Sequence, residues 1–416
     1  IGSGLVGSEM CIRDRKMEKI RRDKNMGKAY DVAVIGAGAI GSSVAYFNAK
    51  KGASVVLIDA GDIAQSTSSR SDGNVLVCDK QPGFDALFAK ASQDMFEGLS
   101  KELDYDFEWR QRGSLFLTET EEEFQMASEF CESMKKCGIP MRMMDRQEVQ
   151  DDEPYLAKDV YGGLETMSDG SVYPIGLTYG MALGAEKKGA VLSLHNRVKG
   201  IRRDGNAFVI ETENGEIAAK NIVDACGVWA PVIGKMVGLD IPIQARQGQI
   251  LVSEQTFQVA RRKVHEFGYM STKFQSDGYK RPVSERVEKY GVAFVFEPTA
   301  SNNFLIGSSR TFAGEDTRSS IEVMKAMAER AIRFFPVIAD IKVIRSYSGL
   351  RPYTPDHMPI VSGTPVEGFY IAAGHEGDGI GLSPITGKVM ADMIAGEEPF
   401  MDLSPLKFDR FAAGQA

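Results

Sequence analysis

The chain has 416 residues, of which 43% are hydrophobic and 25% are charged. These are ordinary values for a globular protein, and the length favours two domains. The formal net charge of −8 argues against nucleic acid or an anionic membrane as the main partner, since both attract basic surfaces. The sequence contains no run of about 18 apolar residues, so we expect no transmembrane helix.

The cysteines and histidines do not form metal-binding patterns. No two of the five cysteines stand as a CxxC pair, and their odd number indicates reduced thiols and a cytoplasmic location. The four histidines lack the spacing of metal ligands, so we expect no metal site. The residues concerned are Cys11, Cys78, Cys131, Cys137, Cys226, His195, His265, His357 and His375.

Residues 1–29 read as an N-terminal extension. Residues 1–15 show neither helical nor strand periodicity and resemble translated adapter sequence, so we expect them to be non-native and the natural start to be Met17 or Met26. The alternative is a short natural tail without regular structure.

A dinucleotide-binding unit follows. An apolar strand over Tyr30–Ile35 leads into GAGAIG at 36–41, a helix over 42–51 and a second strand that ends at Asp59. A dinucleotide site requires this order of strand, GxGxxG, helix, strand and acid. Gly36 permits the tight turn, Gly38 lets a pyrophosphate approach the helix N-terminus, and Gly41 allows close contact between helix and strand. Asp59 is placed to bind ribose hydroxyls, although the motif alone does not separate NAD from FAD.

Helices and sheets then alternate. Amphipathic helices are predicted over 84–103, 121–136 and 177–188, with Gly138 as a C-terminal cap. Residues 198–223 alternate as a meander with Asp-Gly and Asn-Gly turns. Strands at 241–253 and 292–309, with a helix over 319–335, predict a separate antiparallel sheet.

Three further segments bear on whether the dinucleotide is NAD or FAD. They are the small-residue loop QSTSSRSDGNV at 65–75, GLRPYTPDHMP at 349–359, and AAGHEGDGIGLSPITG at 372–387, which precedes a predicted helix over 388–394. Glycines ahead of a helix again offer exposed N–H groups, here for a second part of one cofactor.

These segments, in this order after the GxGxxG unit, resemble the D-amino acid oxidase-like superfamily of FAD enzymes, which includes glycine oxidase, sarcosine oxidase and the catalytic subunits of hydrogen cyanide synthase and opine oxidases. The resemblance extends from Tyr30 to about Ile394. It implies hydride transfer from a substrate carbon to FAD. A covalent link to FAD is not expected, because the 65–75 loop lacks His and the 374–387 turn lacks Cys.

The fold class implied is α/β, with a discontinuous Rossmann-type FAD-binding domain (30–105, 150–235 and 340–400) and an antiparallel-sheet α+β substrate domain (106–149 and 236–339), followed by a tail at 401–416. The residues that the resemblance assigns to FAD are Gly36, Gly38, Ala39, Ile40, Gly41, Asp59, Ser68, Ser69, Arg70, Gly73, Val198, Ala225, Gly227, Trp229, Gly374, Gly377, Gly379, Ile380, Gly381 and Leu382.

The catalytic and substrate-binding predictions rest on fewer residues. Arg351 occupies the position of the carboxylate-binding arginine in glycine oxidase-like relatives, and an Arg fork suits a carboxylate. His375 is predicted to tune the flavin or act in catalysis. We expect Gln249, Tyr269 and Phe294 to line the substrate pocket. The alternatives are that Arg351 is a structural arginine and that His375 is a structural histidine with its hydrogen bonds satisfied. Gln249, like Gln247, would then make core hydrogen bonds, and Tyr269 and Phe294 would pack within strands. Relatives carry a basic residue where this chain has Gly377-Asp378, which departs from a simple glycine oxidase.

The predicted substrate is a small amino acid or secondary amine that is oxidised at its C–N bond. The polar insertion at 265–292 is typical of relatives that are one subunit of a larger dehydrogenase, so we also expect an electron-accepting partner subunit; an ordinary surface loop is the alternative. Two other functions stay open. One is an FAD-dependent 2-hydroxy acid dehydrogenase with His375 as base, and the other is a non-catalytic FAD-bearing assembly subunit.

Overall fold

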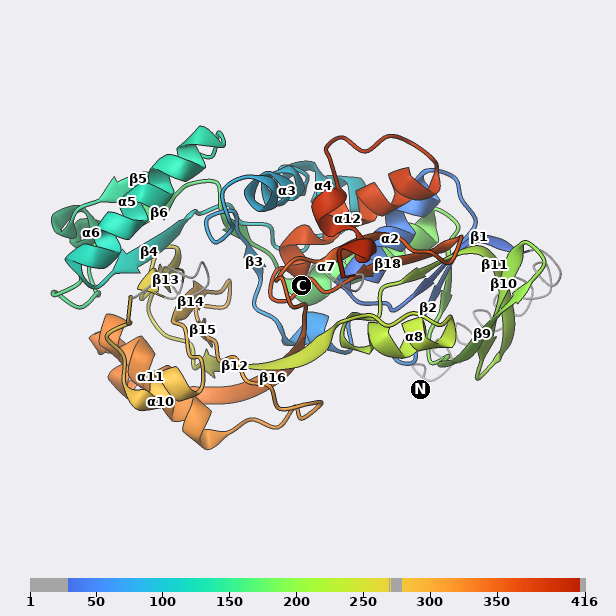
Figure 1. Ribbon diagram of the computed structural model, residues 1–416. Helices are drawn as coiled ribbons and strands as arrows, with labels where there is room; N and C mark the ends of the chain where they lie inside the picture. The colour runs from blue at the N-terminus through green and yellow to red at the C-terminus, as the bar shows by residue number, and fades with distance from the viewer. Residues whose placement is uncertain (1–28, 269, 271–278, 412–416) are drawn as a thin grey trace, which may run out of the picture.

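The computed structural model describes residues 29–268, 270 and 279–411. The predictions for residues 1–28 and for Tyr269 lie outside these residues. Figure 1 shows two lobes, each built on one large sheet, with the long strands β12 (Gln244–Ser253) and β16 (Val343–Tyr353) running between them. No helix among the described residues is both long and apolar enough to cross a membrane.

The first lobe contains the predicted Rossmann-type sheet, in the order β17-β18-β11-β1-β2-β8. The five strands from β18 to β8 are parallel, and β17 is antiparallel to β18. The predicted meander β9-β10-β11 extends the sheet from β11. The strands are β1 (Tyr30–Ile35), β2 (Val55–Ile58), β8 (Val191–Ser193), β9 (Val198–Asp204), β10 (Ala207–Thr212), β11 (Gly215–Asp224), β17 (Ile360–Gly363) and β18 (Phe369–Ala373).

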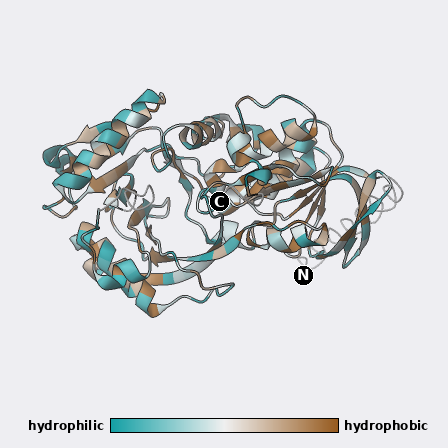
Figure 2. Ribbon diagram, in the orientation of Figure 1, coloured by the Kyte–Doolittle hydropathy of each residue, from teal (hydrophilic) through white to brown (hydrophobic). Residues whose placement is uncertain are grey.

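Other elements pack on both faces of this sheet, so both sets of alternating side chains on β1 and β2 are buried. Val32, Val34 and Leu57 pack under the helices of one face, whereas Ala33 and Ile58 pack on the other face with α8. Figure 2 shows the resulting apolar strands between mixed helices. The helices of this lobe are α2 (Ala39–Lys50), α3 (Phe84–Gln93), α4 (Phe96–Leu103), α7 (Pro174–Lys187), α8 (Ala230–Met236) and α12 (Gly379–Ile394).

The second lobe has an eight-stranded sheet in the order β16-β12-β15-β14-β13-β4-β6-β5. Phe294 stacks on Phe334 with ring centroids 4.8 Å apart in its core. The sheet is antiparallel as predicted, except that β13 and β4 are parallel. Its other strands and helices are β4 (Ser114–Thr118), β5 (Arg142–Met144), β6 (Gly162–Thr166), β13 (Lys263–Glu266), β14 (Val295–Pro298), β15 (Phe304–Gly307), α5 (Glu121–Lys136), α6 (Arg146–Asp152), α10 (Glu285–Lys289) and α11 (Ile321–Phe334).

Short elements complete the chain. They are a two-stranded sheet and several 3-10 turns. They are β3 (Asn74–Val75), β7 (Gly170–Ser171), η1 (Thr67–Arg70), η2 (Gly227–Trp229), η3 (Pro336–Asp340), η4 (Ser404–Leu406) and η5 (Phe408–Phe411).

Several predicted bounds need correction. The helix predicted over 84–103 is two helices, because a tight turn at Asp94–Met95 interrupts it. Helix α12 begins at Gly379 rather than at residue 388, so most of the glycine-rich segment is helical, Pro384 included. β6 and β16 pair in the second sheet although their residues fall in segments assigned to the FAD-binding domain. Strand pairing therefore divides the chain at other points than the motifs did.

Candidate functional site

The first glycine-rich turn connects β1 to α2 through two close backbone approaches. Gly36 has φ +107°, and a Cβ there would lie 2.6 Å from the Ala225 carbonyl oxygen. A Cβ on Gly41 would lie 1.8 Å from the Gly36 carbonyl oxygen. No side chain fits at either position, so the backbone itself forms the turn.

Asp59 at the end of β2 fixes this turn from the side. Its two carboxylate oxygens accept hydrogen bonds from the Ala37 amide at 2.6 Å and the Gly61 amide at 2.8 Å. Asp59 therefore lies beside the glycine turn, and its binding of ribose hydroxyls stays a prediction. The carboxylate lines the same cavity as Gly38 and Ala39.

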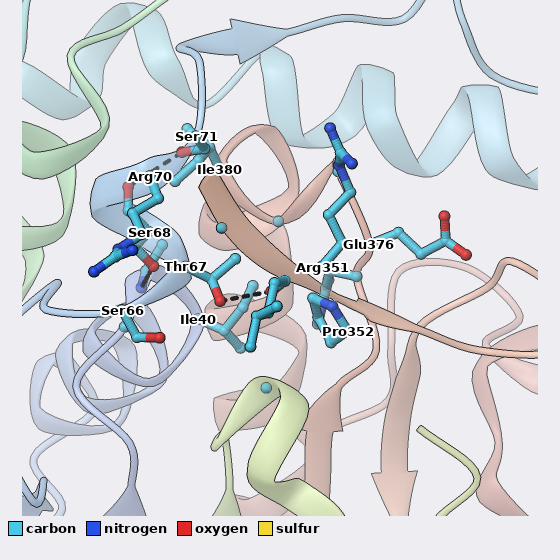
Figure 3. Close-up of a pocket in the computed structure, with 18 of the residues that line it drawn as sticks. Ile40, Ser66, Thr67, Ser68, Arg70, Ser71, Arg351, Pro352, Glu376 and Ile380 are labelled. Carbon is cyan, nitrogen blue, oxygen red and sulfur yellow. Dashed lines mark hydrogen bonds between the residues drawn. The ribbon is translucent and has the colours of Figure 1, made fainter. Parts of the chain in front are cut away.

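The loop at 65–75 lies between α2 and β16. Ser68 Oγ accepts a hydrogen bond from the Ala39 amide at 3.0 Å. Thr67 Oγ1 donates to the Leu350 carbonyl at 2.8 Å, and Arg70 Nη1 donates to the Ser348 carbonyl at 3.0 Å. Figure 3 shows Thr67 turned toward β16, while Glu376 extends away on the far side. These bonds join the first glycine turn to the strand that carries Arg351.

The second glycine-rich turn, residues 374–379, connects β18 to α12. His375 is buried, and its Nε2 lies 3.0 Å from Thr386 Oγ1. Burial lowers the pKa of His375 to about 3, so the ring is neutral near pH 7. The Glu376 carboxylate pairs with Arg246 at 2.5 Å and with His357 at 3.0 Å.

Arg351 reaches the cavity from β16. Its Nη1 donates to the Ser309 carbonyl at 2.9 Å and its Nη2 to Ser308 Oγ at 3.0 Å. The guanidinium passes over Gly248, where a Cβ would lie 2.1 Å from Nη1. Glycine at 248 thus makes room for the arginine. The two bonds fix the plane of the guanidinium at the cavity wall.

One cavity of about 870 Å³ brings these segments together. Gln249 does not line it: successive residues of a strand face opposite sides, so Gly248 and Ile250 face the cavity while the side-chain carbonyl of Gln249 accepts from the Ser320 amide at 3.0 Å. Of the predicted residues, those that line the cavity are Gly36, Gly38, Ala39, Ile40, Asp59, Ser68, Arg70, Val198, Ala225, Gly227, Trp229, Phe294, Arg351, Gly374, His375, Gly377, Gly379 and Ile380.

The remaining predicted residues that the structure describes do not line the cavity. Gly41 packs on Gly36, and Gly73 donates its amide to Glu297 at 3.2 Å. Ser69 Oγ bonds to carbonyls of its own turn, and Ser92 Oγ donates to the Gly381 carbonyl. Leu382 is buried in α12. These residues stand close to cavity residues in the chain, which explains why motif spacing included them.

Sequence reasoning missed a group of cavity residues from the second sheet. His265 is buried and stacks on Phe116 with centroids 5.0 Å apart, and its Nε2 has no hydrogen-bond partner among the described residues. Burial, with a smaller effect of Lys263, lowers the pKa of His265 to about 3. Phe116 and His265 are distant in the chain, so only the pairing of β4 with β13 could have placed them together. The missed residues include Phe116, His265 and Val295 on strands of this sheet, Ser308 and Arg310 after β15, and Asp72 in the loop at 65–75.

The cavity suits FAD on its donor chemistry. Gly38, Ala39 and Ile40 at the start of α2, and Gly379 and Ile380 at the start of α12, line the same cavity. Two helix N-termini therefore open on it, and such termini favour anionic groups. A parallel sheet with this pair of termini and an acid after β2 defines a dinucleotide-binding protein.

The chain belongs to the FAD dependent oxidoreductase family (DAO), whose profile matches residues 31–393. FAD is its cofactor, and the protein is an FAD-dependent oxidoreductase. Glycine oxidase of Geobacillus kaustophilus is 28% identical over 393 residues, covering 92% of this chain and 98% of that protein. The crystal structure of the Geobacillus enzyme superposes with a TM-score of 0.81 over 92% of this chain and 99% of that chain.

One further relative and one further solved structure each match more than nine tenths of the chain. The hydrogen cyanide synthase subunit HcnC of Pseudomonas protegens is 27% identical over 434 residues, covering 93% of this chain and 97% of that protein. L-proline dehydrogenase of P. horikoshii, at 22% identity, shares the fold with a TM-score of 0.82 over 92% of this chain and 98% of that chain.

Proposed function

We propose that the protein oxidises the C–N bond of a small amino acid or secondary amine, with Arg351 binding the substrate carboxylate. The observation that carries this proposal is the guanidinium of Arg351, oriented by Ser308 and Ser309 in the wall of the cavity that the GxGxxG turn also lines. A planar guanidinium pairs with a carboxylate through two parallel hydrogen bonds.

The chain's own residues would bind the substrate, orient it and exclude water. FAD, when bound, accepts the hydride that leaves the substrate carbon. Phe116, Ile250, Phe294 and Val295 give the cavity apolar walls. Apolar walls disfavour the charged, protonated form of the amine. The neutral amine nitrogen keeps the electron pair that drives oxidation.

The two cavity histidines favour an amine over a 2-hydroxy acid. Oxidising a hydroxyl group needs a base to accept its proton. Burial lowers the pKa of both His265 and His375 to about 3. Neither ring is an effective base near pH 7, and His375 Nε2 is also bonded to Thr386. An amine can lose its proton to solvent before it binds.

An anaerobic titration tests this proposal. The purified protein is mixed with a panel of amino acids, secondary amines and 2-hydroxy acids while the visible spectrum of the flavin is recorded. Reduction by an amino acid or amine supports the proposal and names the substrate class. Reduction only by hydroxy acids would select the dehydrogenase alternative, and no reduction by any compound would select the assembly role.

The variant Arg351→Met tests whether Arg351 binds the substrate carboxylate. Loss of one partner of a buried charge pair costs about 2–5 kcal/mol, so kcat/KM for carboxylate substrates should fall roughly 30- to 4,000-fold. Arg345→Met is the control, because Arg345 lies on the same strand with its side chain exposed. Equal activity of the Arg351→Met and Arg345→Met variants would contradict the carboxylate role.

We also propose that the chain is the FAD-bearing component of a heteromeric dehydrogenase in the cytoplasm. The support is the charged insertion at 265–292 and the naming of several relatives as subunits. Among these relatives are the B component of opine oxidase and the beta component of sarcosine oxidase, both from Rhizobium meliloti. Native purification with a tag on this chain tests the idea. A co-purifying protein that reoxidises the reduced flavin supports it, whereas rapid reoxidation by oxygen in the isolated chain contradicts it.

A further inference from the structure

A buried lysine lies beside the second glycine-rich turn. Lys80 is 2% exposed, and its Nζ lies 2.5 Å from Asp79 Oδ1 and 2.6 Å from Asp378 Oδ1. Burial opposes the charge on Lys80, but Asp378, Asp79 and Asp85 outweigh it and raise the pKa well above its usual value. Lys80, Asp79 and Asp378 therefore form a cluster with one positive and two negative charges, the Lys80 cluster.

The Lys80 cluster joins segments that are distant in the chain. Lys80 follows β3, in a turn whose Val77 amide donates to the buried Asp169 at 2.7 Å. Asp378 belongs to the turn at 374–379 and immediately precedes α12. Asp79 and Asp378 both line the FAD cavity. The lysine thus holds the second glycine turn against a different part of the wall.

The position of Asp378 makes this pairing electrically important. The sixteen-residue helix α12 directs the positive end of its dipole at the cavity, and its first turn contains no acidic residue. The negative charge of the Asp378 carboxylate, just before α12, offsets that positive end. Lys80, at 2.6 Å from the same carboxylate, offsets its charge. Without the lysine, only the partial positive charge of the helix terminus would offset a partly buried anion at the cavity wall.

We propose that Lys80 is a positioning residue that fixes the 374–379 turn and neutralises Asp378, so that FAD in this cavity is easier to reduce. Added negative charge near the cofactor disfavours electron uptake, and a compensating cation favours it. The proposal rests on FAD occupying this cavity but not on the identity of the substrate. Chemical reduction with a dye as reference therefore tests it independently of amine oxidation.

The midpoint potential of the FAD-loaded protein is the decisive measurement. In Lys80→Met, the ratio of reduced to oxidised FAD at a fixed potential should fall at least tenfold, which is about 30 mV for a two-electron couple. Apoprotein prepared from this variant should also bind FAD more weakly. Asp378→Asn should shift the potential in the opposite direction, because it removes the negative charge.

The double variant separates charge from packing. Lys80→Met with Asp378→Asn has the same net charge in the Lys80 cluster as the unmodified protein, so its potential should return toward that value. Lys388→Met, on α12 and paired with Asp392 at 2.6 Å near the surface, is the control and should leave the potential unchanged. A potential in Lys80→Met equal to that of the unmodified protein, or no recovery in the double variant, overturns the proposal. If Lys80→Met does not fold, an unchanged potential in Asp378→Asn overturns it.

Discussion

The turns at 36–41 and 374–379 both precede a helix and both line the FAD cavity, yet they are held in place differently. Close backbone approaches at Gly36 and Gly41 form the first turn, with Asp59 bonded to its amides. The second depends on side chains from elsewhere in the chain: Lys80 on Asp378, and Arg246 with His357 on Glu376. The glycines of the first turn and the acid after β2 form one known sequence pattern and can be recognised, whereas the side chains that hold the second turn follow no such pattern.

Replacing a glycine of the first turn should have the largest effect. In Gly41→Val, the Cβ would lie 1.8 Å from a backbone oxygen that cannot move without displacing β1. Overpacking of this kind costs about 3 kcal/mol or more. We expect loss of bound FAD and a lower melting temperature, measured by the ratio of flavin to protein absorbance and by calorimetry.

Gly98→Ala is the control for that substitution. Gly98 lies in α4, and a Cβ there meets no atom of the described residues within 4 Å. Alanine in a helix is about 0.8 kcal/mol more favourable than glycine, so this variant should keep its FAD and gain slightly in stability. An unchanged FAD content in Gly41→Val would show that the first turn does not need its close backbone approach.

Asp59→Ala should have the next largest effect. The substitution removes the acceptor of both the Ala37 and Gly61 amides, and hydrogen bonds to a charged acceptor contribute about 1.5–3 kcal/mol. Urea unfolding of the apoprotein measures the loss. Asp62→Ala is the control, since Asp62 is 60% exposed in its pair with His195 and exposed pairs contribute less than about 1 kcal/mol. Equal losses in the two variants would remove Asp59 from the support of the first turn.

The sequence predicted the region of the first turn better than the region of the second turn. β1, the GxGxxG turn and Asp59 form one continuous local pattern, and the structure has them where that pattern places them. The predicted start of α12 was nine residues too late, because glycines and Pro384 argue against a helix. Packing of this segment against α2 and α3 nevertheless stabilises the helix. Tertiary packing overrode local propensity there.

The alternation of side chains along β12 determines which of its residues face the cavity. Gln249 and Gly248 are adjacent in sequence, but the pairing of β12 with β15 and β16 turns Gly248 to the cavity and Gln249 to Ser320. A one-residue uncertainty in register changes the face of every side chain. His265, on a strand of four residues between a parallel and an antiparallel neighbour, offered no periodic signal in the sequence.

The second turn should respond to pH through His375. Its pKa is about 3 in the folded protein, below the ordinary value of 6.5. The unfolded chain therefore gains a proton that the folded protein does not, and the stability that His375 contributes above pH 6.5 is lost as the pH falls toward 3. The loss approaches about 1.4 kcal/mol per pH unit. His375→Gln should have a shallower dependence of unfolding free energy on pH between 6 and 4; parallel curves for the two proteins would contradict a buried neutral ring.

The smallest effect is expected from Ser68→Ala, which removes a side chain that supports the first turn from outside. Ser68 Oγ accepts from the Ala39 amide at 3.0 Å, and one neutral hydrogen bond contributes about 0.5–1.5 kcal/mol. Ser69→Ala is the control, because Ser69 Oγ bonds only to carbonyls of its own turn among the bonds described for it. Urea unfolding of both apoproteins gives the difference. If Ser68→Ala cost as much as Asp59→Ala, the first turn would depend on a side chain outside its sequence motif as the second one does, and the contrast between the two turns would fail.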